Sequence, residues 1–318
     1  MTSFATVLGQ ARGRAREYGI IVIFATLFVA LSFSTSTFLT RQNMVNLLDQ
    51  TAIVGILTLA ATLCIVSGVF DLSLSAVLAV SAIITVQMTN QYGMAAGFTI
   101  GILAGAGLGC VNGLVVNYMQ VNSFIATLAT SIVYRGLAVV ITGGAIVSTT
   151  DMSFLVFNRP SPVFGITWGS WLFIGVAVLC ALLLSRTTYG RALYAVGGNR
   201  EAARLSGIRT KIVSTGVMTL SGSLAATAGL IAASRSASAQ ASMYTGLELS
   251  AIAATVVGGT SIMGGEGTIG KAVVGILILA LIGNGFNLLG IDPTYQLVVQ
   301  GLLILLAVGA DQFLRRRR

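Results

Sequence analysis

Long apolar runs alternate with short polar or glycine-rich connections along almost the whole chain. A bilayer core of about 30 Å is crossed by about 20 helical residues, and the backbone groups of a lipid-exposed segment must pair within that segment. Each run is therefore predicted to be a membrane helix, and the shorter runs suggest tilted, broken or re-entrant segments. Ten runs fit the pattern: residues 19–39, 52–69, 73–90, 94–117, 122–142, 168–185, 212–233, 248–263, 270–289 and 295–313.

The composition excludes a water-soluble protein. Hydrophobic residues make up 55% of the 318 residues and charged residues only 8%, against about 25% charged residues in soluble domains. A disordered chain is excluded as well, because disorder requires low hydrophobicity and high charge. The remaining fold class is an all-α polytopic membrane protein with about ten transmembrane helices.

The basic residues predict the orientation. The net charge of +9 comes mainly from the tail of residues 1–18, the loop 186–211 and the four arginines of residues 315–318. Because basic loops stay on the cytoplasmic side, both termini and the loop 186–211 are predicted to be cytoplasmic, with loop 143–167 in the periplasm. The predicted number of spans gives the same orientation, because ten crossings place both termini and the loop after the sixth span on one side of the membrane. Basic residues beside apolar runs also indicate contact with membrane lipid and no nucleic-acid partner.

A glycine series marks the run at 94–117. Spacing of four residues places these glycines nearly along one helix face, which lets another backbone approach closely. We expect helix packing inside one subunit, with a subunit contact or a pathway surface as the alternative. The series consists of Gly93, Gly97, Gly101, Gly105, Gly109 and Gly113.

Few residues in this chain suggest catalysis. There is no histidine, and the three cysteines are isolated in apolar runs, so neither a metal site nor a disulfide is expected. Residues 265–270 fit GxGxxG, but a phosphate-binding loop needs a preceding strand, and we interpret the segment as a tight turn between helices. Asp71 is the one plausible proton carrier, with helix capping as the alternative. No nucleophile lies beside a base, so no catalytic residue and no enzyme is predicted.

The loop 186–211 contains a predicted short amphipathic helix that lies on the membrane surface. Asn199 is a suitable N-cap, an acid in the first turn favours the helix N-terminus, and Gly207 suits the end of a helix. A basic loop that serves only to set the orientation is the alternative.

This loop resembles a known family. Glu201-Ala202-Ala203 followed by Gly207 is similar to the coupling loop of ABC importer permeases, and residues 197–208 resemble the ribose-type sugar permeases in particular. Residues 71–73, 122–128, 258–268 and 284–291 resemble further segments of that family, although Asn122 stands where proline is usual. The likeness extends over residues 45–315.

The resemblance implies a bacterial inner-membrane protein with a type II ABC importer-like fold, in which residues 1–318 form a single permease domain. It implies three protein partners: a cytoplasmic ABC ATPase that uses the ATP, a periplasmic sugar-binding protein and a second permease subunit, expected as a homodimer. The chain itself would bind no cofactor. The ATPase-coupling residues are predicted to be Gly197, Gly198, Asn199, Glu201, Ala202, Ala203 and Gly207. The candidate pathway residues are Asp71, Asn122, Ser123, Phe124 and Thr127.

Three alternatives remain open at this point. Branched-chain amino acid permeases share the superfamily, so an amino acid is the alternative substrate. A stand-alone channel or ion-coupled carrier would need no ATPase, and a structural membrane scaffold would move no solute at all. The sequence does not name the sugar.

Overall fold

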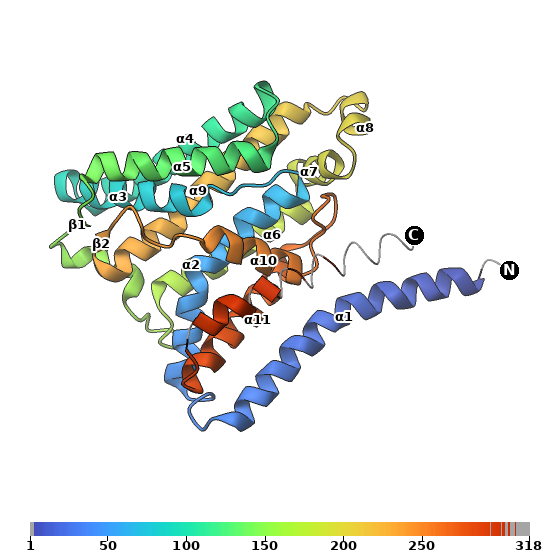
Figure 1. The fold of residues 1–318 in the computed structure, drawn as a ribbon, viewed down its shortest axis with the longest axis horizontal. Coiled ribbons are helices and arrows are strands. Elements are labelled where there is room, and N and C mark those ends of the chain that lie inside the picture. The colour runs from blue at the N-terminus through green and yellow to red at the C-terminus, as the bar shows by residue number, and fades with distance from the viewer. Residues whose placement is uncertain (1–2, 293, 300, 303–304, 306–308, 310–318) are drawn as a thin grey trace.

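The structure is a computed structural model that describes residues 3–292, 294–299, 301–302, 305 and 309. Helices form nearly all of it (Figure 1). They are α1 (Ser3–Ser34), α2 (Arg41–Val66), α3 (Leu74–Tyr92), α4 (Met94–Tyr118), α5 (Ser123–Thr142), the 3-10 helix η1 (Met152–Asn158), α6 (Trp168–Arg186), α7 (Thr188–Gly198), α8 (Arg200–Leu205), α9 (Thr210–Ser236), α10 (Leu247–Val257) and α11 (Ile269–Leu288). Two short strands, β1 (Val147–Ser148) and β2 (Ser238–Ala239), pair antiparallel.

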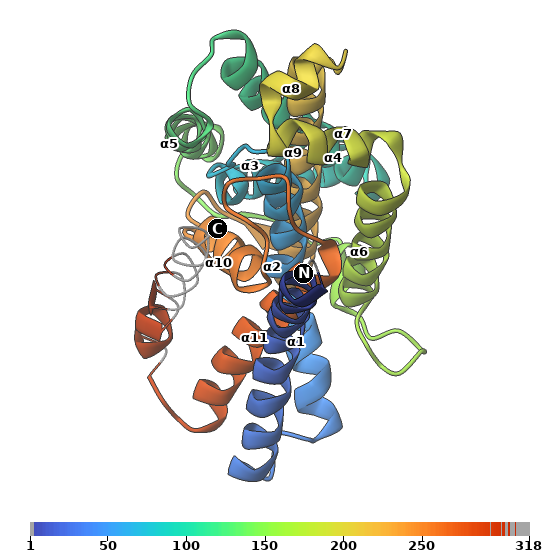
Figure 2. The ribbon, with the colours of Figure 1, turned by 90° about the vertical axis from the view of Figure 1, so that its right-hand side faces the viewer.

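Helices α2, α3 and α9 form the centre of the bundle and are the most enclosed of the long helices. Helix α4 packs along both α3 and α9. Helices α4, α5 and α6 each bury a much smaller part of their length, and Figure 2 shows α5 and α6 on opposite sides of the bundle. The large apolar side chains exposed on these outer helices suit a lipid or protein environment rather than water.

The molecule has two distinct ends. Figure 1 shows α7 and α8 together at one end, here called the α8 end, and β1 and β2 at the opposite end, here called the strand end. Helix α2 finishes at the α8 end, since the backbone N–H of Gly265 and Gly197 of α7 lie against the Val66 carbonyl. Helix α9 begins just after α8 and finishes just before β2, so it runs the full distance between the two ends.

Most of the predicted spans are present. Within the described residues, seven helices are long and apolar enough to cross a membrane: α2, α3, α4, α5, α6, α9 and α11. Two further predicted runs coincide with shorter apolar helices, Gly19–Ser34 within α1 and α10. Only part of the run 295–313 lies within the described residues, so the total of ten stays a prediction.

Several predicted boundaries were wrong. Helix α2 begins at Arg41 rather than at 52, because Thr40 caps its first turn. The polar residues of this first part find partners in other elements, as Asp49 accepts a hydrogen bond of 2.6 Å from Thr167. Helix α10 stops at Val257 rather than at 263. Gly259, two residues after Val257, takes a positive φ of 88°. A left-handed residue of this kind ends a helix. The tail of residues 1–18 is helical from Ser3 onwards.

Candidate functional site

The predicted surface helix forms as α8. The side chain of Asn199 caps it by accepting the N–H of Ala202 at 2.9 Å, and Gly207 ends it with a φ of 86°. Ala203 is its buried residue, and Leu205 is 74% exposed. A short, capped helix with so little burial leaves most of its surface available for another protein.

One ion pair stiffens α8. The Nε of Arg204 donates to Oε2 of Glu201 at 3.0 Å, and the two side chains are 62% and 65% exposed. This hydrogen bond lowers the pKa of the Glu201 carboxyl and raises the pKa of the Arg204 guanidinium. Exposed pairs contribute little to stability, so we regard Glu201 mainly as a charged group presented to solvent.

Helix α7, which the sequence did not predict, joins α8 to the bundle. Its residue Gly197 touches the end of α2 so closely that an added Cβ would lie 1.9 Å from the Val66 carbonyl oxygen. Gly264 and Gly265 meet Gly68, Gly197 and Gly198 at the same point. We call the contact among Gly68, Gly197, Gly264 and Gly265 the glycine junction.

Two hydrogen bonds hold the glycine junction. The N–H of Gly265 donates to the Val66 carbonyl at 2.9 Å, and the Tyr194 hydroxyl of α7 donates to the Gly267 carbonyl at 2.6 Å. The turn predicted at residues 265–270 is thus a contact surface for α7. Displacement of α7 must act on both α2 and the loop before α11.

The predicted pathway residues Ser123 and Thr127 lie at the break between α2 and α3 and hold its backbone by hydrogen bonds. We call this contact the clamp. Between α2 and α3 the chain is not helical, and Ser123 and Thr127 of α5 accept the N–H groups of Phe70 and Leu72, each at 3.0 Å. Asn122 caps α5, and the ring of Phe124, two residues further on, meets that of Phe70 edge-on. These side chains satisfy backbone groups that the break leaves unpaired.

Asp71 is the centre of a buried hydrogen-bond network. The carboxylate is 3% exposed and accepts from the Ser73 hydroxyl at 2.6 Å and from the Ser221 hydroxyl of α9 at 2.7 Å. The Ser73 hydroxyl accepts from Asn112 of α4 at 2.7 Å, and Asn112 accepts from the Tyr134 hydroxyl of α5 at 2.9 Å. The network ties the break to three helices, and Asp71 also accepts the backbone N–H of Ser73 at 3.0 Å, directly before α3 begins.

The glycine series of α4 lies against helices of the same chain. Gly97 and Gly101 face α3, whereas Gly105, Gly109 and Gly113 face α9. An added Cβ on Gly109 would lie 2.3 Å from the Met218 carbonyl oxygen. Gly93 differs, because it forms the turn between α3 and α4 with a φ of 85° and has no atom within 4 Å of an added Cβ.

Arg135, a charged residue inside α5, was missed by the sequence analysis. Its guanidinium donates to the Ser75 hydroxyl at 2.9 Å and to the Met243 carbonyl at 3.0 Å. It therefore holds the segment between β2 and α10 against α3 and α5. A charge within an apolar run is rare enough to mark a special residue, and that signal was present in the sequence.

Among the described residues, no group of three or more histidine, cysteine or acidic side chains is placed to hold a metal ion. Cys64, Cys110 and Cys180 are free thiols.

Comparison with known proteins identifies relatives over most of the chain. Residues 43–308 match the family described as branched-chain amino acid transport system / permease component. The L-arabinose transport system permease protein of Escherichia coli K12 is 40% identical over 278 residues, which are 85% of this chain and 83% of the relative. The ribose import permease protein of Bacillus subtilis 168 is 40% identical over 264 residues, 82% of each chain. No solved structure matches.

Proposed function

Because the chain belongs to the branched-chain amino acid transport system permease family, we propose that it is the membrane permease subunit of an ATP-driven sugar importer. The observation that carries the proposal is the attachment of the exposed helix α8 to α2 through α7 and the glycine junction. Relatives named for L-arabinose and ribose favour a sugar over a branched-chain amino acid.

The α8 end is the part that would bind the ATPase. Glu201 and Ala202 are exposed on α8, and Gly207 after it has no atom within 4 Å of an added Cβ, so the partner has room to approach closely. ATP binding and hydrolysis would displace α8 as a rigid body, and the glycine junction would pass the displacement to α2 and the loop before α11. This is a rigid-body route to alternating access.

The remaining partners are proposed from the two ends of the molecule and from the apolar side chains exposed on its outer helices. The protein would lie in the bacterial inner membrane with its α8 end in the cytoplasm. The strand end would then face the periplasm, where a sugar-binding protein would dock. Helix α5 exposes large apolar side chains such as Ile132, 70% exposed, and Val140, 79% exposed. Helix α6 likewise exposes Leu179, 66% exposed, and we propose that a second copy of the chain and membrane lipid together cover these outer helices.

The solute pathway would not pass through the clamp. Ser123 and Thr127 already hold the break between α2 and α3, and Asp71 is enclosed by its network. We therefore expect these residues to act on stability and place the pathway elsewhere in the subunit.

Reconstitution tests the proposal directly. Proteoliposomes that hold the chain with the ATPase and the binding protein of the same importer should accumulate labelled L-arabinose or ribose only when ATP is supplied. Replacing Glu201 and Gly207 with arginine should abolish uptake and ATPase co-purification, whereas Thr188→Arg, which places one arginine at the exposed start of α7, should leave both unchanged. Saturable uptake by the chain alone would instead show a channel or carrier.

A further inference from the structure

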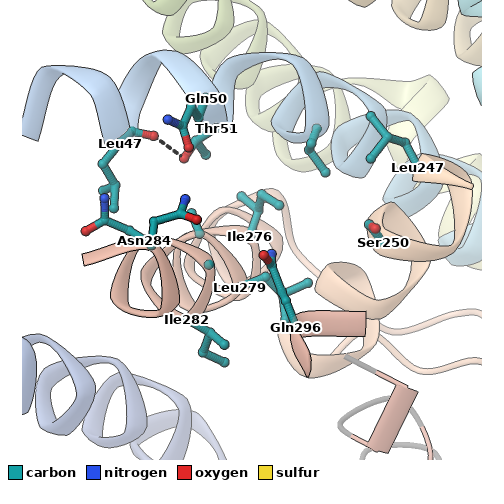
Figure 3. Close-up of a pocket in the computed structure, with 14 residues that line it drawn as sticks. Leu47, Gln50, Thr51, Leu247, Ser250, Ile276, Leu279, Ile282, Asn284 and Gln296 are labelled. Atoms are coloured by element: carbon teal, nitrogen blue, oxygen red, sulfur yellow. Dashed lines mark hydrogen bonds between the residues drawn. The ribbon is translucent and has the colours of Figure 1, made fainter. Parts of the chain in front are cut away.

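A cavity of about 200 Å³ lies between α2, α10, α11 and the helical residues 294–299 (Figure 3). Its polar lining shares one chemistry, that of neutral amides and hydroxyls. These side chains are Gln50 and Thr51 of α2, Ser250 of α10, Asn284 and Asn287 of α11, and Gln296. None of the described residues that line it is charged. We call it the amide cavity.

The amide cavity lies within an otherwise apolar region. Helix α11 is one of the candidate spans, and Asn284 and Asn287, three residues apart, lie on one of its faces. Polar side chains within membrane segments face cavities or the bundle interior and often mark the route of a solute.

A second pocket, near the strand end, shares a lining residue with the amide cavity. Gln50 lines both the amide cavity and a second, strongly polar pocket, which includes Asp49 and Arg235. Arg235 lies one residue before the end of α9, close to β2. A solute that entered the polar pocket at the strand end would meet Gln50 on its way to the amide cavity.

Parts of the lining are held in place before any solute arrives. Asn43 donates to Oδ1 of Asn284 at 3.1 Å, and Asn284 donates to Oδ1 of Asn43 at 2.8 Å, so the two amides fix each other across α2 and α11. Gly283 leaves room for the amide of Gln296, because an added Cβ would lie 2.7 Å from its Nε2. Groups fixed in this way lose little freedom when a ligand binds.

From this chemistry we propose that the amide cavity binds the hydroxyl groups of the transported sugar, an inference that rests on the proposed function. Each sugar hydroxyl both donates and accepts, and an amide side chain offers both partners. The apolar side chains of Leu47, Ile276 and Leu279 line the rest of the cavity and suit the C–H groups of a sugar ring. An amino acid would bring two charges that this lining leaves unpaired, which is costly.

Binding to the isolated permease tests the inference. The full chain in lipid nanodiscs would be titrated with L-arabinose and with ribose, and binding would be followed by saturation-transfer NMR. Gln296→Leu and Asn287→Leu should each weaken binding about tenfold, equivalent to about 1.4 kcal/mol, the scale of a lost hydrogen bond. Gln91→Leu, at the exposed end of α3, is the matched control and should bind as the parent does.

The outcomes separate the two proposals. Unchanged affinity in both cavity variants, or no sugar signal from the parent chain, would overturn the cavity assignment even if ATP-driven uptake is observed. Equal binding of leucine would overturn its preference for sugars. Sugar binding that the cavity variants weaken, without any ATP-driven uptake by the complex, would instead refute the importer.

Discussion

Replacing Gly197 with alanine tests whether the glycine junction transmits movement from α8 to the bundle. Gly197 has an ordinary helical backbone, so alanine introduces no backbone strain of its own. The new Cβ would lie 1.9 Å from the Val66 carbonyl oxygen, which is 1.5 Å inside the 3.4 Å of an ordinary contact. The Val66 carbonyl belongs to the backbone of α2 and the new Cβ is attached to the backbone of α7. Neither can rotate aside, so α7 must move away from α2.

The size of the effect follows from this displacement. The new Cβ would also lie 2.8 Å from the Gly265 nitrogen, whose N–H donates to the Val66 carbonyl at 2.9 Å, so making room for it separates the two partners of that bond. Overpacking costs about 1–3 kcal/mol, and a buried hydrogen bond contributes about 1 kcal/mol. We therefore expect the variant to lose about 2–4 kcal/mol of stability and to transport less sugar for each ATP hydrolysed.

The assay compares uptake with ATP hydrolysis in the same proteoliposomes. Gly175→Ala on α6 is the control, since an added Cβ there has no atom within 4 Å, and it should match the parent. A general folding defect would lower uptake and hydrolysis in parallel, whereas loss of coupling lowers their ratio. A parental ratio and a parental melting temperature for Gly197→Ala would refute the reasoning.

Three further predictions concern the other parts of the site. Thr127→Val leaves a buried backbone N–H of the α2–α3 break unpaired, so the melting temperature should fall by the equivalent of about 1–3 kcal/mol; an unchanged value would return this residue to the pathway candidates. Gly109→Ala collides with the α9 backbone and should unfold at lower temperature or fail to accumulate, whereas Gly107→Ala has open space and should behave as the parent. The pKa of the Glu201 carboxyl is lowered by Arg204, so this pair forms above the ordinary carboxyl pKa and is lost only as pH falls through the lowered value. ATPase co-purification should then stay constant between about pH 6 and 8, and a loss within that range would show that another group controls it.

Local sequence signals placed several elements correctly. The cap at Asn199 and the glycine at 207 define α8 to within a residue, because capping depends on neighbours only a few positions away. Helix α7 was missed, since its basic, glycine-containing segment resembles a loop. Its buried residues Gly190, Leu193 and Val196 recur every three positions, a helical spacing that was readable in the sequence.

The candidate site was only partly predictable for a different reason. Ser123 and Thr127 were identified as polar residues at the start of a span, but their hydrogen bonds to the α2–α3 break join positions more than fifty residues apart. The partners of Arg135 on α3 and beyond β2 are 60 and 108 residues away in the chain. No local pattern specifies such pairs.

The sequence by itself determined that this chain is a helical membrane protein, where most of its helices lie, and which family it belongs to. These properties depend on the hydrophobicity of consecutive residues and on short motifs. The tertiary structure decided that five glycines of α4 face α3 and α9, that Gly197 rests on α2, and that amides from α2 and α11 share one cavity with Gln296. Those results depend on which distant surfaces meet, because a contact between two helices depends on the shape of both.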